Sequence, residues 1–165
     1  MTKMNWVVIP LRVLLVLVFL GLIMAQVFSL PGEFRQMADE NPDAGFVPGL
    51  LLTFAILEIL CFQIVIVCTW RLLTLVRADR IFSDESFVWV DVIVWAMAAA
   101  WIMLAGLSTY LVAVIYFTPE LRDPGTPILL TGMVLIGAVV VLTVVVLRAL
   151  LRQATVLRTD LEEVI

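Results

Sequence analysis

A single carboxylate within a long apolar run is the residue of this chain best placed to do chemistry. Glu58 lies about nine residues into an apolar stretch that covers residues 50–76. An ionised carboxylate at that depth in a bilayer is costly, so intramembrane acids commonly bind protons, cations or polar ligands. Polar side chains that could reach it from other apolar runs are those of Gln26, Ser108, Thr109 and Thr131. Two other interpretations stay open: a protonated or hydrogen-bonded carboxyl that stabilises a helix bundle, or exposure to a water-filled crevice.

Two opposite charges lie at similar depth in different apolar runs. Arg12 and Asp91 are each expected about two helical turns inside the cytoplasmic boundary of the membrane. Leaving either charge alone in lipid is expensive, which favours an ion pair between them. Alternatively, the long Arg12 side chain could extend to lipid phosphates.

The last apolar run ends in a polar segment that could contact lipid or a partner. Arg148 and Arg152 are like charges one turn apart, so we expect anionic headgroups to be their partners. Beyond them, apolar residues recur at alternating spacings of three and four, which predicts an apolar seam on a helix. The seam residues are Leu147, Leu150, Ala154, Leu157, Leu161 and Val164. The acids beside it, Asp160, Glu162 and Glu163, either solvate the helix end or form a surface for a basic partner.

Most catalytic and metal chemistry lacks the residues it would need here. The chain has no His and two Cys, and Cys61 and Cys68 are seven residues apart on one predicted helix. That spacing excludes a disulfide between them, and a thiolate or imidazole metal site is not expected. There is no glycine-rich phosphate loop. We therefore expect no enzyme activity, no metal and no cofactor.

These side chains must be positioned by helices in a membrane. The chain is 64% hydrophobic and 15% charged, and four apolar runs exceed the roughly 20 residues that cross a bilayer. Because lipid offers the backbone no hydrogen-bond partners, the runs must be helical. The sequence predicts an all-α fold, an integral membrane four-helix bundle within one domain covering residues 1–165. The spans are expected at about 7–30, 50–76, 87–117 and 128–151, followed by a helical tail at 152–165.

Local signals predict where these helices begin and end. Pro31-Gly32 should end the first helix, which we expect to be retained because it is too long for a signal peptide. Pro48 suits the start of the second helix. Ser83 resembles an N-cap for a third helix from Asp84 to Phe117, which at about 51 Å is longer than the hydrocarbon core. Thr126-Pro127 should start the fourth. Two small-residue pairs, Ala98-Ala99 and Ala105-Gly106, should let a neighbouring helix approach the third closely.

The basic residues predict the orientation. Eight of the 10 Lys and Arg residues flank the N-terminus, the middle loop or the C-terminus, and only Arg35 and Arg122 lie in the other two loops. By the positive-inside rule both termini are cytoplasmic, with helices three and four extending into the cytoplasm. We expect a multi-pass protein of the inner (plasma) membrane.

Two segments resemble an uncharacterised bacterial membrane family, the domain of unknown function 2975. They are Arg80-Ile81-Phe82-Ser83 in the middle loop and Leu150 to Arg158 at the start of the tail. The final segment, Thr159 to Val164, keeps the acid-Leu-Val skeleton of the run that ends many members and lacks its Asn and Thr. The resemblance implies four spans, no enzymatic activity and a small helix-turn-helix regulator as a partner.

The function expected from the sequence is a regulatory or binding module that acts through its cytoplasmic face, with sequestration of a small transcriptional regulator as its mechanism. The seam could instead be buried by the third helix or by a second copy in a homo-oligomer. The chain itself is not expected to contact nucleic acid. The alternative is a small oligomeric transporter, or an ion- or ligand-binding membrane protein, that uses Glu58.

Overall fold

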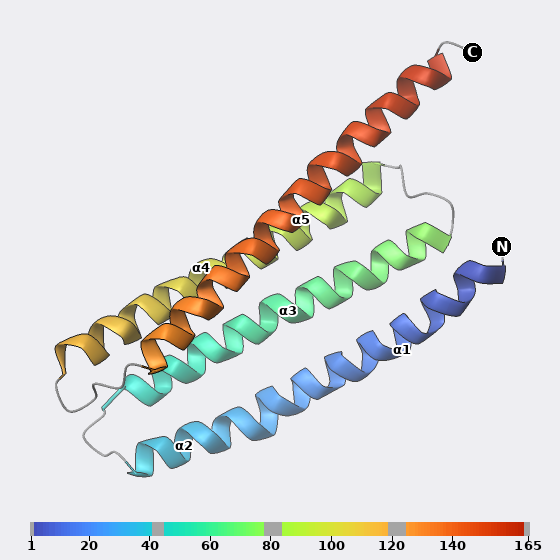
Figure 1. Cartoon of the computed structure of the whole chain (residues 1–165). Helices are drawn as coiled ribbons and strands as arrows, with labels where there is room; N and C mark the ends of the chain where they lie inside the picture. Colours follow the sequence, from blue (N-terminus) through green and yellow to red (C-terminus); the bar gives the residue numbers. More distant parts are fainter. Residues whose placement is uncertain (1, 41–44, 78–83, 119–124, 164–165) are drawn as a thin grey trace. The chain divides into compact units, whose positions relative to one another are not determined.

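A computed structural model describes residues 2–40, 45–77, 84–118 and 125–163, with side chains for 8–40, 45–76, 86–118 and 125–156. Nearly all of these residues are helical and none is in a strand, which confirms the all-α prediction for the part described (Figure 1). The chain divides into two compact units, residues 1–81 and 82–165. Each unit is described by itself, and the expectation of one domain stays a prediction.

The first unit is built from two long helical stretches. Helix α1 (Thr2–Met24) leads through a π-helical segment, η1 (Ala25–Ser29), into α2 (Leu30–Glu40). Helix α3 (Val47–Arg77) runs antiparallel and packs against α1 and α2. Its second residue is Pro48, in the first turn, where a proline leaves no intrahelical hydrogen bond unmade.

The expected end of the first helix at Pro31-Gly32 is wrong, because the helix continues through both residues to Glu40. A proline inside an α-helix clashes with the carbonyl four residues earlier, which here belongs to Val27. Val27 lies in η1, where the turn is widened and the Leu30 N–H donates to the Ala25 carbonyl, five residues back. The wider turn relieves the clash, so the helix passes Pro31 without ending.

The second unit is a helical hairpin. Helix α4 (Asp84–Phe117) has the predicted bounds, and α5 (Gly125–Glu163) contains Pro127 in its first turn. The two helices pack side by side and antiparallel (Figure 1). At 1.5 Å per residue they are about 51 and 58 Å long, so both exceed a hydrocarbon core of about 30 Å.

An indole ring of α4 packs against the backbone of α5. The Trp101 Nε1–H donates to the Val134 carbonyl of α5 at 2.9 Å. A Cβ added to Gly137 would lie 2.9 Å from Trp101 Cδ1, so this glycine makes room for the ring. Gly106 and Ala99, from the predicted small-residue pairs, do not form this contact. Nothing lies within 4 Å of a Cβ added to Gly106, and Ala99 is exposed.

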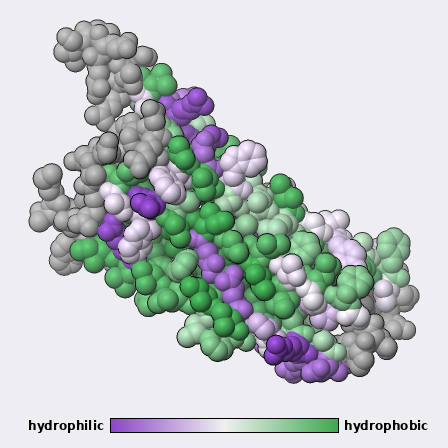
Figure 2. Space-filling view, turned by 180° about the vertical axis from the view of Figure 1, so that it is seen from behind, coloured by the Kyte–Doolittle hydropathy of each residue, from purple (hydrophilic) through white to green (hydrophobic). Residues whose placement is uncertain are grey.

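Four helical stretches are long and apolar enough to cross a membrane: Val8–Glu40, Val47–Val76, Ser86–Phe117 and Gly125–Val156. Their large apolar side chains are widely exposed, for example Trp95 at 76% and Ile136 at 68%. Hydrophobic side chains dominate the face shown in Figure 2. A surface of this kind is stable only in an apolar environment, which is consistent with a lipid bilayer.

Candidate functional site

Glu58 lies near the middle of its span, on the side of α3 that faces away from α1. The residues of α3 that contact the first helix include Ile56, Gln63 and Trp70, spaced at intervals of seven. Glu58 is two residues from Ile56 and therefore about 200° around the helix from it. Its side chain is half-buried and makes no hydrogen bond to another described residue. The carboxylate therefore has no described partner that would fix its position.

The polar cluster predicted around Glu58 is not assembled within the first unit. Gln26 lies in η1, where its Nε2 donates to the Ile56 carbonyl at 3.4 Å and its Oε1 accepts from Gln63 Nε2 at 2.8 Å. Ser108 and Thr109 belong to the second unit, where the Thr109 hydroxyl donates to the Ala105 carbonyl. The role of these residues around Glu58 stays a prediction.

The Gln26–Gln63 hydrogen bond is a contact that the sequence analysis missed. Both residues lie near the middle of their spans. A primary amide there must find a partner on another helix, because lipid provides none. Gln26 and Gln63 are the only amide side chains in the apolar runs 7–30 and 50–76, which is the signal that could have paired them.

Arg12 forms a second polar contact between α1 and α3. Its guanidinium lies 5.2 Å from the ring centroid of Trp70, within cation–π range, and its Nη2 donates to the Thr74 hydroxyl at 3.0 Å. Its Nε is buried without a hydrogen-bond partner among the described residues. The sequence-based pair of Arg12 with Asp91 joins two different units and stays a prediction.

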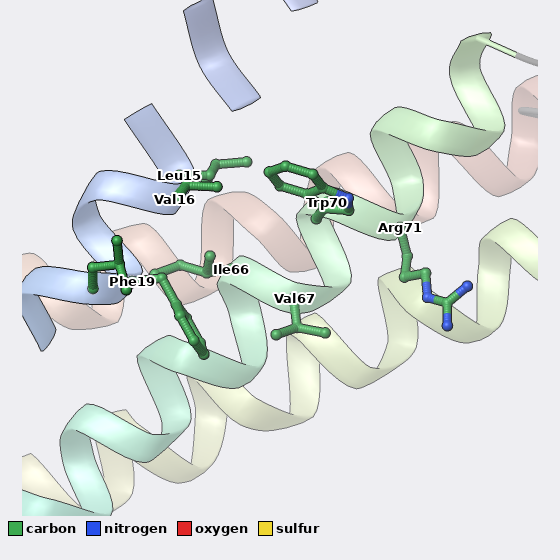
Figure 3. Close-up of a pocket in the computed structure, with 8 residues that line it drawn as sticks. Leu15, Val16, Phe19, Ile66, Val67, Trp70 and Arg71 are labelled. Carbon is green, nitrogen blue, oxygen red and sulfur yellow. The ribbon is translucent and has the colours of Figure 1, made fainter. Parts of the chain in front are cut away.

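An apolar pocket of about 310 Å³ lies between α1 and α3 (Figure 3). Leu15, Val16 and Phe19 line it from α1, facing Ile66 and Trp70 of α3. Apart from Arg71 at one end, its lining is apolar or aromatic. A lining of this kind is compatible with a hydrocarbon chain.

Asp91 and Arg148 form an ion pair in the second unit. The Asp91 Oδ1 and Arg148 Nε atoms are 2.6 Å apart, and both side chains are partly exposed. The sequence analysis named both residues without pairing them. Both lie near the same end of the α4–α5 hairpin, because the helices run antiparallel.

The same end of the hairpin contains a polar pocket of about 350 Å³. Its lining includes Asp91, Arg148 and Arg152, which were all identified from the sequence. Phe87, Thr155 and Val156 complete it. Within the described residues this is the site that brings the largest number of predicted positions together.

Helix α5 extends beyond the first residue of α4. The pairs Asp91–Arg148 and Trp101–Val134 place Asp84 level with about residue 153 of α5. Since α5 continues to Glu163, about ten residues, or about 15 Å, extend past α4 (Figure 1). This part of α5 has no neighbour in α4.

The apolar seam lies on the side of α5 away from α4. Leu147 and Leu150 are 58% and 55% exposed, and Ala154 is exposed as well. Helical periodicity places Leu157 and Leu161 on this same face. The side chains of Leu157, Asp160, Leu161, Glu162 and Glu163, and all of Val164, lie outside the described residues. In the described part, α4 does not bury the seam.

No group of three or more His, Cys, Asp and Glu side chains in the described ranges could hold a metal ion. The expectations of no metal, no cofactor and no enzyme activity stay predictions.

The four long apolar helices define a multi-pass membrane protein. A profile of the family described as "Protein of unknown function (DUF2975)" matches residues 32–165, and the chain belongs to this family. No curated protein and no solved structure matches it.

Proposed function

We propose that this chain is a non-enzymatic protein of the inner membrane that holds a basic regulatory partner at the cytoplasmic end of α5. The observation that carries the proposal is the extension of α5 about ten residues past α4. A helix that leaves both its neighbour and the bilayer with an apolar face needs another surface to bury that face.

Charge supports a basic partner. Residues 155–165 contain Asp160, Glu162 and Glu163 and one basic residue, Arg158. An acidic surface beside an apolar seam complements a protein that carries positive charge for DNA binding. A small helix-turn-helix regulator, which the family resemblance implies, has that chemistry. Holding its basic face at the membrane would keep the regulator from DNA.

The proposal requires both termini in the cytoplasm, which the distribution of Lys and Arg favours. Labelling of single cysteines with a membrane-impermeant maleimide tests this in a Cys61→Ser/Cys68→Ser background. We expect Asp39→Cys to react in intact cells and Gln153→Cys to react only after permeabilisation. The reverse labelling pattern would show that the end of α5 is not in the cytoplasm and would overturn the proposal.

The proposal itself is tested by co-purification with a small helix-turn-helix regulator, chosen from the genes that neighbour the gene of this chain. Leu161→Lys places a charge in the seam, while Thr159→Lys places the same charge about 200° around the helix. Both added charges repel a basic partner. The difference in recovered regulator between the two variants therefore measures the contribution of the apolar seam. We expect about tenfold less regulator with Leu161→Lys than with Thr159→Lys, and loss of recovery when residues 155–165 are deleted.

The other outcomes are equally informative. Equal recovery with the unaltered chain and all variants would remove the tail from the mechanism, and no recovery with the unaltered chain would remove the regulator. If Leu161→Lys instead converts an oligomer to a monomer, a second copy of the chain occupies the seam.

A further inference from the structure

The polar pocket of the second unit has the components of an anion site. Arg148, Arg152 and Thr155 follow one another at successive turns of α5, on the side that faces α4. Phe87 and Val156 form apolar walls, and the volume of about 350 Å³ falls in the usual range for small-ligand pockets.

Asp91 orients one of the two guanidinium groups. Its Oδ1 contacts Arg148 Nε at 2.6 Å, which occupies one of the five N–H donors of this side chain. The terminal N–H groups remain for a second acceptor. Arg152 makes no ion pair with another described residue. Among the described side chains that line the pocket, Asp91, Arg148 and Arg152 together leave a single positive charge.

The height of the pocket matches the edge of the hydrocarbon. The spans Ser86–Phe117 and Gly125–Val156 are each about 48 Å long, so roughly six residues at either end exceed a core of about 30 Å. Asp91 and Arg148 therefore lie close to the boundary, and Arg152 and Thr155 lie at the level of headgroups. Arginine binds phosphate through paired N–H donors with a geometry that lysine does not provide.

We propose that this pocket binds the phosphodiester of one monoanionic phospholipid, such as phosphatidylglycerol. The terminal N–H groups of Arg148 and the guanidinium of Arg152 hold the phosphate oxygens, and Phe87 and Val156 contact the start of the acyl chains. The single positive charge of the site matches a single negative charge. A zwitterionic lipid carries an additional cation that Arg152 would repel.

The test is native mass spectrometry of the full chain in a nonionic detergent, with phosphatidylglycerol and phosphatidylcholine of equal acyl chains titrated separately. A third titration uses glycerophosphoglycerol, the same headgroup without acyl chains. We expect the unaltered protein to prefer phosphatidylglycerol to both. Arg152→Gln should weaken binding of phosphatidylglycerol by about tenfold to hundredfold, the effect of losing a charge-assisted hydrogen bond, and so reduce its preference over phosphatidylcholine.

Arg35→Gln is the matched control, because it removes the same charge from an exposed residue in the other unit. It should bind phosphatidylglycerol as the unaltered protein does. The double variant Asp91→Asn/Arg148→Gln removes both members of the ion pair, so it keeps the net charge of the pocket, creates no new unpaired ion and should fold. It should nevertheless weaken phosphatidylglycerol binding by about tenfold, because the oriented donors of Arg148 are lost.

Three results would overturn the proposal. The first is equal binding of the two lipids by the unaltered protein, and the second is equal binding of glycerophosphoglycerol and phosphatidylglycerol. The third is unchanged affinity in both Arg152→Gln and the double variant, or the same loss in Arg35→Gln.

Discussion

Asp91 of α4 and Arg148 of α5 are held 2.6 Å apart at the end of a helical hairpin, with their side chains partly exposed. The contact aligns α4 with α5. It also pairs two charges at a level where an unpaired charge would face the edge of the lipid core. Arg148 is the only charged residue of the apolar run 128–151, and Asp91 compensates it within its own unit.

The ion pair predicts coupling between the two substitutions. Asp91→Asn leaves Arg148 without its counterion and should lower the free energy of unfolding by about 1–2 kcal/mol, between the values for exposed and buried pairs. Arg148→Gln should act similarly. The double variant should lose about 1 kcal/mol less unfolding free energy than the sum of the two single losses. A double-mutant cycle of denaturant unfolding in detergent measures this difference. Strict additivity would show that the contact contributes nothing.

Gly137 should not tolerate a methyl group, although the helix as such would favour it. In Gly137→Ala the new Cβ would meet Trp101 Cδ1 at 2.9 Å, so the ring and its hydrogen bond to Val134 must shift. We expect a loss of about 1–3 kcal/mol, as for other overpacked sites. Gly132→Ala is the control, since nothing lies within 4 Å of its added Cβ.

Because alanine is the better helix former by about 1 kcal/mol, Gly132→Ala should be neutral or stabilising. Thermal unfolding of both variants in the same detergent measures the difference. A Gly137→Ala protein as stable as Gly132→Ala would contradict the close packing of Trp101 against α5.

The Gln26–Gln63 hydrogen bond predicts that the double substitution is milder than the singles suggest. Gln63→Leu leaves the Gln26 amide without its better partner in the membrane, and Gln26→Leu does the same to Gln63. Interhelical hydrogen bonds in bilayers contribute about 0.6 kcal/mol on average and at most about 1.7. A cycle with both variants and the double should give a coupling in that range. A coupling energy of zero would show that the two amides are not hydrogen-bonded to each other.

Glu58 should be dispensable for folding. It makes no hydrogen bond to another described residue and lies on the face of α3 away from α1, so Glu58→Leu removes no described hydrogen bond or ion pair. Replacing a mid-span carboxylate by leucine also favours insertion into lipid. We expect unchanged or higher thermal stability for Glu58→Leu, with Ile59→Leu as the neighbouring control. A large loss of thermal stability would show that the Glu58 carboxyl stabilises the helix bundle.

The sequence by itself determined the helices. Four long apolar runs in a chain with 15% charged residues leave the backbone no alternative to a helix in lipid. Helix caps depend on residues that are neighbours in the sequence, so they too can be predicted from it. Hence α4 begins at Asp84 as predicted, and Pro48 and Pro127 lie in first turns. The error at Pro31 has a local cause too, because a proline signals the end of a helix unless the preceding turn widens.

The tertiary structure decided which side chains meet. Helical periodicity places a residue on a face, but its partner depends on the register and rotation of the neighbouring helix, which no local pattern encodes. Gln26, Asp91 and Arg148 were therefore identified from the sequence one by one, but not Gln63 as the partner of Gln26, nor Asp91 and Arg148 as a pair. The contact between Trp101 and Gly137 was missed altogether. The apolar seam is the clearest case. Its spacing was visible in the sequence, but only the packing of α5 showed that Leu147 and Leu150 face away from α4.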